Sequence, residues 1–250
     1  MRYAVHCWRK LATRLLDWVY TPQCELCGEV LQDGRSLCES CDRELPRLSA
    51  PFCATCGEPF QGRIDGPFQC PNCGELDFTF SFARPAMLRD ERTRQLVHQL
   101  KYGRAIHLAA ELGRLAAESF RDERLRPALA GHWPLVPVPL HRSRFQHRNF
   151  NQAAEIARSV ARHTGLPVLA ALKRIRRTDT QALLGRKQRL SNLHGAFAVT
   201  GAGRRHLATA AAGVILIDDV LTTGSTAEAC AATLRRAGCK TVLVVTVMRG

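Results

Sequence analysis

The chain lacks any apolar run that approaches the ~18–20 residues needed to span a bilayer, so stable membrane insertion is not expected. Aromatic residues account for only 6% of its 250 residues, which leaves few rings on which nucleic-acid bases could stack. The first residues mix basic and apolar side chains without a continuous apolar core or a small-residue cleavage site. They do not form a convincing secretory signal, so a cytoplasmic location is expected.

The charge is distributed unevenly along the chain. Residues 1–80 hold 8 Lys+Arg and 11 Asp+Glu (net −3), whereas residues 81–250 hold 28 and 11 (net +17), and the sum is the formal +14. Residues 141–192 alone carry 12 basic and 2 acidic side chains. A field of that sign attracts phosphates, on a small metabolite or on nucleic acid. The alternative is a solvated, arginine-rich surface.

Hydrophobic residues make up 46% of the chain and charged residues 23%, as in an ordinary folded protein. The length predicts one large domain or two unequal ones. Apolar periodicity and capping residues predict the elements. Helices are expected over residues 4–19, 90–120, 151–163 (capped by Asn151) and 226–237 (stopped by Gly238), strands over 135–140, 214–217 and 242–247, irregular structure over 20–80 and a loop over 198–213. The final strand, helix and strand form a βαβ unit, which favours a parallel sheet of the α/β class.

Nine of the eleven cysteines lie within the first 80 residues, and eight of them form four Cys-x-x-Cys pairs. The pairs are Cys24/Cys27, Cys38/Cys41, Cys53/Cys56 and Cys70/Cys73. Because the cytosol keeps thiols reduced, clustered cysteines there are metal ligands more often than disulfides. Eight thiolates make two tetrahedral four-sulfur zinc sites; free thiols and an iron–sulfur cluster are the alternatives.

The simplest pairing is sequential, with the first two pairs in one site and the last two in the other, and an interleaved pairing is the alternative. Glycine follows three of the pairs, at Gly28, Gly57 and Gly74. A turn that aims backbone N–H groups at sulfur often needs the positive φ that glycine supplies. The three cysteines outside these pairs, Cys7, Cys230 and Cys239, are expected to be small buried hydrophobes.

A second chemical signal is the segment from Val214 to Thr226. A buried strand ends at two carboxylates, and a hydroxyl-rich loop then enters a helix. The residues are Asp218, Asp219, Thr222, Thr223, Gly224, Ser225 and Thr226. Helix N-termini bind anions through unpaired backbone N–H groups. The loop has no lysine and no G-x-x-x-x-G-K pattern, so it is not a nucleoside-triphosphate loop. A plain capped turn explains the hydroxyls but not the paired aspartates.

This segment resembles the thirteen-residue phosphoribosyl-pyrophosphate (PRPP) loop of type I phosphoribosyltransferases. The resemblance implies that Asp218 and Asp219 contact the ribose hydroxyls and that residues 222–226 hold the 5′-phosphate. It also implies that Mg²⁺ binds across the ribose and the pyrophosphate.

Two further stretches are similar to the ComF/GntX family. One runs from Pro137 to Gln152, where Asn149 stands in place of the family's usual glycine. The other comprises Arg177, Thr178, Gln181, Leu184, Arg189, Asn192, Ala196 and Phe197. With the cysteine pairs, the likeness covers nearly the whole chain. It implies a double zinc ribbon over 21–80 and a type I phosphoribosyltransferase-like α/β domain, a parallel sheet flanked by helices, over 81–250. The helical spacing of the first residues adds an amphipathic helix over residues 1–20.

Several polar residues lie where they could serve this ligand. Arg142, Arg144 and Arg148 follow a strand expected beside the loop, and ligands bind at the carboxyl ends of parallel strands. Guanidinium groups there would stabilise charge on departing pyrophosphate. Asn151 and Gln152 are further phosphate candidates, whereas Arg148 and Lys101, which precedes Tyr102, are candidates for a catalytic role. The alternative for these cations is a basic surface patch.

Three functions remain open. The first is phosphoribosyl transfer to an acceptor that no residue identifies. The second is a role in DNA uptake or DNA utilisation, which the family resemblance implies, with single-stranded DNA and DNA-uptake proteins as partners. The third is a PRPP-sensing docking module without turnover.

Overall fold

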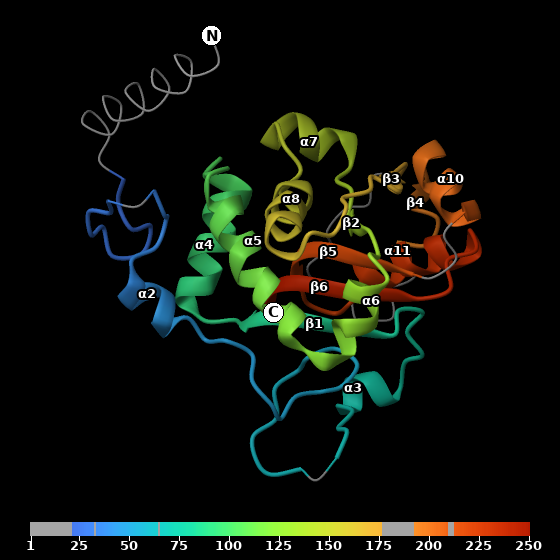
Figure 1. The fold of residues 1–250 in the computed structure, drawn as a ribbon, viewed down its shortest axis with the longest axis horizontal. Coiled ribbons are helices and arrows are strands. Elements are labelled where there is room, and N and C mark those ends of the chain that lie inside the picture. Colours follow the sequence, from blue (N-terminus) through green and yellow to red (C-terminus); the bar gives the residue numbers. More distant parts are fainter. Residues whose placement is uncertain (1–21, 33, 65, 177–192, 210–212) are drawn as a thin grey trace. The chain divides into compact units, whose positions relative to one another are not determined.

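The structure is a computed structural model that describes residues 22–32, 34–64, 66–176, 193–209 and 213–250 (Figure 1). The helix expected over residues 4–19 lies outside the described residues. So do six positions of the family resemblance: Arg177, Thr178, Gln181, Leu184, Arg189 and Asn192. None of the helices in the described part combines the length and the apolar character that crossing a bilayer requires.

Residue contacts divide the chain into two compact units, Met1–Leu45 and Pro46–Gly250. The first two cysteine pairs belong to the first unit, and the last two pairs belong to the second unit, as does the sheet. The domain boundaries expected at residues 20/21 and 80/81 stay predictions.

The described part of the first unit consists of short loops and one helix, α2 (Glu39–Glu44). A β-bridge joins Gln23 to Val30 across the first Cys-x-x-Cys turn. The large buried apolar side chains of this part are Leu31, Leu37 and Leu45. So small an apolar core needs a further cross-link to hold the segment together.

The second unit is built on a four-stranded sheet in the order β1-β6-β5-β2. Its strands are β1 (Phe82–Leu88), β2 (Leu135–Pro137), β5 (Val214–Leu221) and β6 (Val242–Arg249), and each neighbouring pair is parallel. All eight residues of β6 are buried, as expected of a central strand covered on both faces. The predicted α/β class is confirmed, and β2 lies directly beside β5 as expected. The sequence pattern does not predict β1, because Arg84 and Pro85 interrupt its apolar run.

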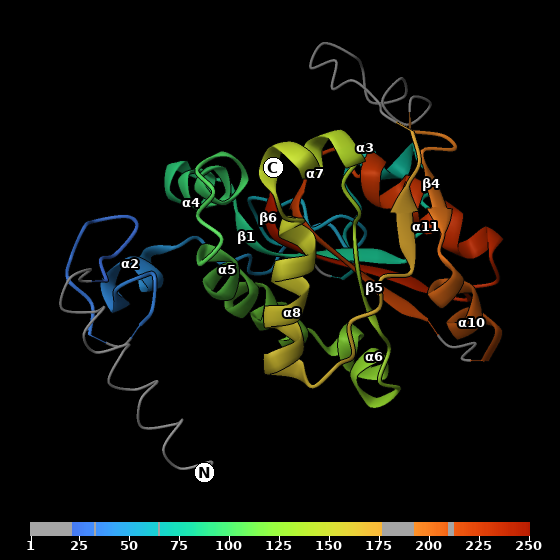
Figure 2. The ribbon, with the colours of Figure 1, turned by 90° about the horizontal axis from the view of Figure 1, so that it is seen from above.

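Helices flank this sheet, with α5 (Leu108–Ala117), α8 (Gln152–Thr164) and α11 (Ser225–Arg236) packed on it. The unit also contains α3 (Pro71–Gly74), α4 (Glu91–Tyr102), α6 (Arg126–Ala130) and α7 (Arg142–Arg148), with the 3₁₀ turns η1 (Glu118–Arg121) and η2 (Glu123–Leu125). Helices α5 and α8 run side by side (Figure 2). A Cβ at Gly113 would lie 2.2 Å from Cβ of Ser159, so this contact requires glycine. Helix α11 shares a hydrophobic core with alternate residues of β5, including Val214 and Leu216.

The single helix expected over residues 90–120 is wrong. Helix α4 ends at Tyr102 and is capped by Gly103, and Arg104 then adopts a φ of 56° before α5 begins at Leu108. The left-handed residue turns the chain away from the helix axis. The break leaves Lys101 in the last turn of α4.

The loop expected over residues 198–213 is also wrong. It contains the end of β4 (Phe197–Val199), which pairs antiparallel with β3 (Leu172–Arg174), and the helix α10 (Gly201–Thr209). A Cβ at Gly203 would lie 2.5 Å from the carbonyl oxygen of Ala171. The small residues that favour a loop in sequence therefore serve close packing of a helix on backbone.

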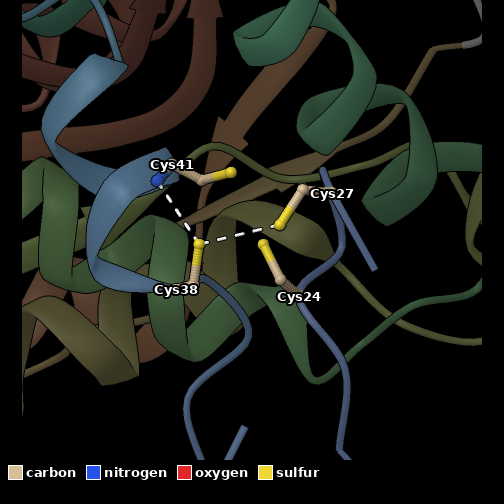
Figure 3. A group of neighbouring side chains, drawn as sticks. All are labelled: Cys24, Cys27, Cys38 and Cys41. Carbon is tan, nitrogen blue, oxygen red and sulfur yellow. Dashed lines mark hydrogen bonds between the residues drawn. The ribbon is translucent and has the colours of Figure 1, made fainter. Parts of the chain in front are cut away.

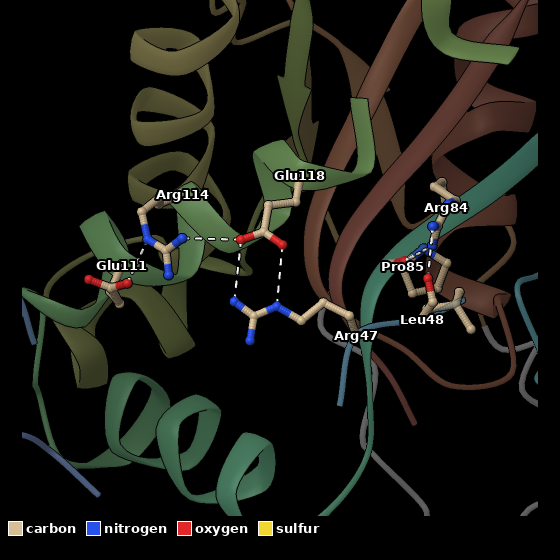
Figure 4. A network of polar contacts seen from close by, with 7 residues as sticks. All are labelled: Arg47, Leu48, Arg84, Pro85, Glu111, Arg114 and Glu118. Atoms are coloured by element: carbon tan, nitrogen blue, oxygen red, sulfur yellow. Dashed lines mark hydrogen bonds and ion pairs between the residues drawn. The ribbon is translucent and has the colours of Figure 1, made fainter. Parts of the chain in front are cut away.

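Polar contacts fasten the start of the second unit to one edge of the sheet (Figure 4). Nε of Arg47 lies 3.3 Å from Oε2 of Glu118, and Oε1 of the same carboxylate lies 3.1 Å from Nη1 of Arg114. Arg84 donates from Nη2 to the carbonyl oxygen of Leu48 at 2.9 Å. Backbone hydrogen bonds join the same segment to β1. The segment covers the edge of β1, which would otherwise present unpaired backbone groups.

Candidate functional site

The first cysteine cluster comprises Cys24, Cys27, Cys38 and Cys41, whose sulfur atoms all lie within 4.8 Å of one another (Figure 3). Sγ of Cys27 lies 3.7 Å from Sγ of Cys38. A tetrahedron with Zn–S bonds of about 2.3 Å has S···S edges of roughly 3.8 Å, so the spacing fits one zinc ion. Gly28 follows the first turn with a φ of 77°, as expected.

The second cluster comprises Cys53, Cys56, Cys70 and Cys73, which also lie within 4.8 Å of one another. Sγ of Cys56 lies 3.7 Å from Sγ of Cys70. The sequential pairing of the four Cys-x-x-Cys motifs is therefore confirmed, and the interleaved alternative is wrong. All four residues are buried and belong to the same hydrophobic core as α11 and β5. Gly57 has the expected positive φ of 70°, whereas Gly74 lies within α3, where its glycine is not needed for the turn.

Backbone N–H groups favour the thiolate form of Cys53 in the second cluster. Burial raises the pKa of Cys53, but N–H groups of Cys70, Cys56 and Thr55 more than offset this and lower its pKa to about 7. One of these hydrogen bonds, from N of Cys70 to Sγ of Cys53, measures 3.3 Å. Because zinc binds thiolate rather than thiol, this arrangement is suited to a metal ligand.

The predicted phosphate loop, residues 222–226, begins where β5 ends and includes the first residues of α11. Gly224 precedes α11 with a φ of 79°, a conformation that favours glycine. The hydroxyls of Thr223 and Ser225 lie 2.8 Å apart, and the N–H of Ser225 points at Oγ1 of Thr223 at 3.4 Å. A hollow is lined by Asp218, residues 220–227 and Thr246 of β6. The loop thus collects hydroxyls and helix N–H groups around one concave surface, the arrangement that binds a phosphate.

The two aspartates lie within β5, which continues to Leu221 rather than ending at Ile217 as expected. Successive residues of a strand point to opposite faces. Asp218 lines the hollow, whereas Asp219 is buried and pairs with Lys101, with Oδ1 and Nζ 2.9 Å apart. Oδ2 of Asp219 is buried without a hydrogen-bond partner among the described residues.

Asp218 is an unusually weak acid for an aspartate. Burial and the neighbouring charge of Asp219 raise its pKa to about 7, although Lys101 and Arg174 act in the opposite direction. A carboxyl group that titrates near neutrality within a hollow is a feature of ligand-binding and catalytic sites.

Two of the predicted cations, Lys101 and Arg148, lie near the end of β5. Lys101 pairs with Asp219, and Arg148 lies over the ring of the neighbouring Tyr102. The guanidinium of Arg148 lies 5.0 Å from the ring centre of Tyr102, next to Lys101. Arg148 is only 8% exposed. Among the described residues it has no carboxylate partner, so a buried positive charge is left for an anion. Arg144 interacts electrostatically with Arg174, whereas Arg142 is exposed on α7.

The candidates that follow α7 have different surroundings. Asn151 caps α8 by accepting the N–H of Ala153 at 3.1 Å and donates to the carbonyl of Val138. Gln152 is buried, and its Oε1 has no partner in the described part of the chain. Asn149 ends α7 with a φ of 65°. Asparagine can therefore stand here in place of the family's usual glycine, because it tolerates the left-handed region better than most residues.

Three residues close to Asp218 or to the loop were not candidates in the sequence. Arg174 of β3 lies near Asp218, Thr246 of β6 lines the hollow, and Arg249 ends β6 beside the loop. The positions of Thr246 and Arg249 follow from the rule that ligands bind at the carboxyl ends of parallel strands. The sequence does not predict that Arg174 lies near Asp218, because β3 comes from a segment without strand periodicity.

Comparisons with known proteins bear on both regions. A family model described as "Double zinc ribbon domain" matches residues 15–74. The DNA utilization protein YhgH of Salmonella typhimurium is 31% identical over 222 residues, which cover 88% of this chain and 87% of that protein. The chain belongs to the ComF/GntX family. Competence protein F of Haemophilus influenzae is 28% identical over 209 residues, covering 83% of this chain and 88% of that protein. The two four-cysteine clusters of this ComF/GntX protein are its two zinc sites.

Proposed function

We propose that this ComF/GntX protein binds PRPP with Mg²⁺ at the carboxyl end of β5 and acts in DNA uptake or DNA utilisation. The observation that carries the ligand assignment is the hollow in which Asp218 faces the hydroxyl-rich start of α11. The N–H groups and hydroxyls of residues 222–226 would hold the 5′-phosphate. The carboxylate of Asp218 would accept the ribose hydroxyls.

The surrounding cations support a diphosphate on the same ligand. Arg148 is buried on the ring of Tyr102, and Lys101 lies in the adjacent position. Carboxylate and phosphate oxygens are the ligands that Mg²⁺ prefers. The ion would bind through the ligand's ribose and pyrophosphate oxygens.

The DNA role comes from the relatives and from charge. The relatives are named for competence and for DNA utilisation. Residues 81–250 carry 28 basic and 11 acidic side chains, and such an excess favours contact with the phosphates of single-stranded DNA. DNA-uptake proteins are the partners expected in that setting.

The buried Arg148 also favours a second candidate, phosphoribosyl transfer without a DNA role. In that reaction an acceptor attacks C1 of the ribose, the C1–O bond to pyrophosphate breaks, and pyrophosphate leaves with the bonding electrons. Arg148 would stabilise the charge that develops on the leaving group.

A titration of the zinc-loaded protein with PRPP and Mg²⁺, with and without single-stranded DNA, tests these proposals. Saturable PRPP binding is expected, together with DNA binding that weakens about tenfold or more between 50 and 200 mM salt. DNA binding that does not depend on salt would exclude a backbone contact. Pyrophosphate release with a panel of bases would favour the transferase, and its absence with every base would count against it.

A further inference from the structure

The second cysteine cluster contacts the phosphate loop through one arginine. Arg249, the last residue of β6, is 8% exposed. Its Nη1 donates to the carbonyl oxygens of Leu221 at 2.9 Å and Thr222 at 2.8 Å, where β5 passes into the loop. Its Nη2 forms an ion pair with the carboxylate of Glu58. One planar guanidinium thus joins the loop to Glu58, which lies next to the cluster in sequence.

Glu58 is fixed by the cluster itself. It lies two residues after Cys56, and its carbonyl oxygen accepts the N–H of Cys53 at 2.7 Å. The N–H of Gly57 also donates to the carbonyl oxygen of Cys53 at 2.9 Å. The backbone of Glu58 is therefore set by the same turn that places two of the sulfur ligands.

A second set of contacts lies at the other end of the loop. The stacked rings of Phe78 and Phe80, 4.6 Å apart, follow the last cysteine of the cluster. A Cβ at Gly224 would lie 3.3 Å from the nearer ring atom of Phe78. The N–H of Thr79 donates to Oε2 of Glu228 in the first turns of α11 at 2.7 Å. The chain around the cluster thus touches both the start and the end of the phosphate loop.

We infer that Arg249 is a positioning residue for the phosphate loop, and that Glu58, two residues after Cys56 of the second cysteine cluster, holds Arg249 in the arrangement that phosphate binding requires. This inference rests on the proposed PRPP function. Loop N–H groups bind phosphate well only when they are held in place before the ligand arrives. Arg249 fixes the carbonyls of Leu221 and Thr222, and so sets the path of the residues that follow.

The predicted effect is selective for one end of the ligand. In the full-length protein, Arg249→Met should weaken binding of ribose 5-phosphate about tenfold or more. Binding of inorganic pyrophosphate should stay within about twofold, because the cations expected to bind it lie on α4 and α7. The carbonyl of Leu221 keeps a hydrogen bond from the N–H of Gly250 at 2.8 Å, so the variant leaves the strand ladder intact.

Glu58→Gln provides a gentler variant, because this side chain is 41% exposed and the change preserves its size. It should weaken ribose 5-phosphate binding by a smaller factor than Arg249→Met does. In a protein that already carries Arg249→Met it should weaken binding little further, because both substitutions remove the same ion pair. Arg236→Met is the matched control: this exposed arginine donates to the carbonyl oxygen of Ala232 on its own helix. Calorimetric titration supplies the affinities, and zinc content and melting temperature report on folding.

The outcomes separate the two proposals. Selective loss of ribose 5-phosphate binding with unchanged zinc content supports the positioning role. Wild-type affinities in both variants, or equal losses for ribose 5-phosphate and pyrophosphate, would overturn it while leaving the proposed function standing. Failure of the wild-type protein to bind either ligand would overturn the proposed function itself.

Discussion

Replacing Cys53 and Cys56 by serine is expected to unfold the unit Pro46–Gly250, whereas the same change at Cys24 and Cys27 is expected to leave that unit folded. Each double variant should lose one zinc ion per chain. The difference arises because the second cluster is part of the core that includes α11 and β5, and the first cluster belongs to the other unit.

The magnitude of this effect should be large. Structural zinc contributes about 10–16 kcal/mol of apparent binding free energy at neutral pH, and a whole domain is stable by only about 5–15 kcal/mol. Loss of the second site should therefore leave this unit unfolded at 25 °C, so that heating shows no cooperative melting transition. Elemental analysis for zinc and near-ultraviolet circular dichroism would check it. Equal melting of the two double variants would contradict the placement of the second cluster in the core of the sheet.

The second large effect concerns Asp218. Burial and the charge of Asp219 raise its pKa from 3.8 to about 7. As pH rises from about 4 to 7, the unfolded chain ionises this residue while the folded chain keeps it protonated, so the free energy of unfolding falls through that window. Above pH 7 the full penalty is present. Asp218→Asn removes the ionisation, and the variant should be more stable than the wild type at pH 8, by on the order of 1–3 kcal/mol.

Thermal melts at pH 5.5 and pH 8 would test this, because the advantage of the variant should be larger at pH 8. Asp77→Asn is the matched control, since Asp77 is exposed on the same unit. A variant that is no more stable than the wild type at pH 8 would contradict the raised pKa of Asp218. The same variant should lose affinity for PRPP, so stability and binding would change in opposite directions.

The sequence predicts the parts of this protein whose chemistry is local. Cys-x-x-Cys spacing fixes which sulfurs can share an ion, and the run from Val214 to Thr226 contains both its strand and its helix start. The pairing of β2 with β5 also follows from short apolar runs and the rule for parallel sheets. The capping of α8 by Asn151 is readable because the cap and the helix are adjacent in sequence.

Features that depend on tertiary packing are not readable in the same way. Strand β1 forms although Arg84 interrupts its apolar run, because the arginine donates a hydrogen bond to the carbonyl oxygen of Leu48. Helix α10 forms in a glycine-rich segment because Gly203 allows close contact with Ala171. Arg249 and Glu58 lie 191 positions apart, so no local pattern links them. Lys101 is the exception: the sequence makes it a candidate, and the structure adds its partner, Asp219.

The most direct test of the central claim is a calorimetric titration of PRPP with Mg²⁺ into the wild-type protein and into the variant Asp218→Asn with Asp219→Asn. The wild-type protein should bind PRPP, and the double variant should bind it at least about tenfold more weakly, because it loses the carboxylate of Asp218 that lines the hollow and the ion pair between Asp219 and Lys101. Equal affinities in the two proteins would contradict the assignment of the hollow at the end of β5 as the phosphoribosyl site.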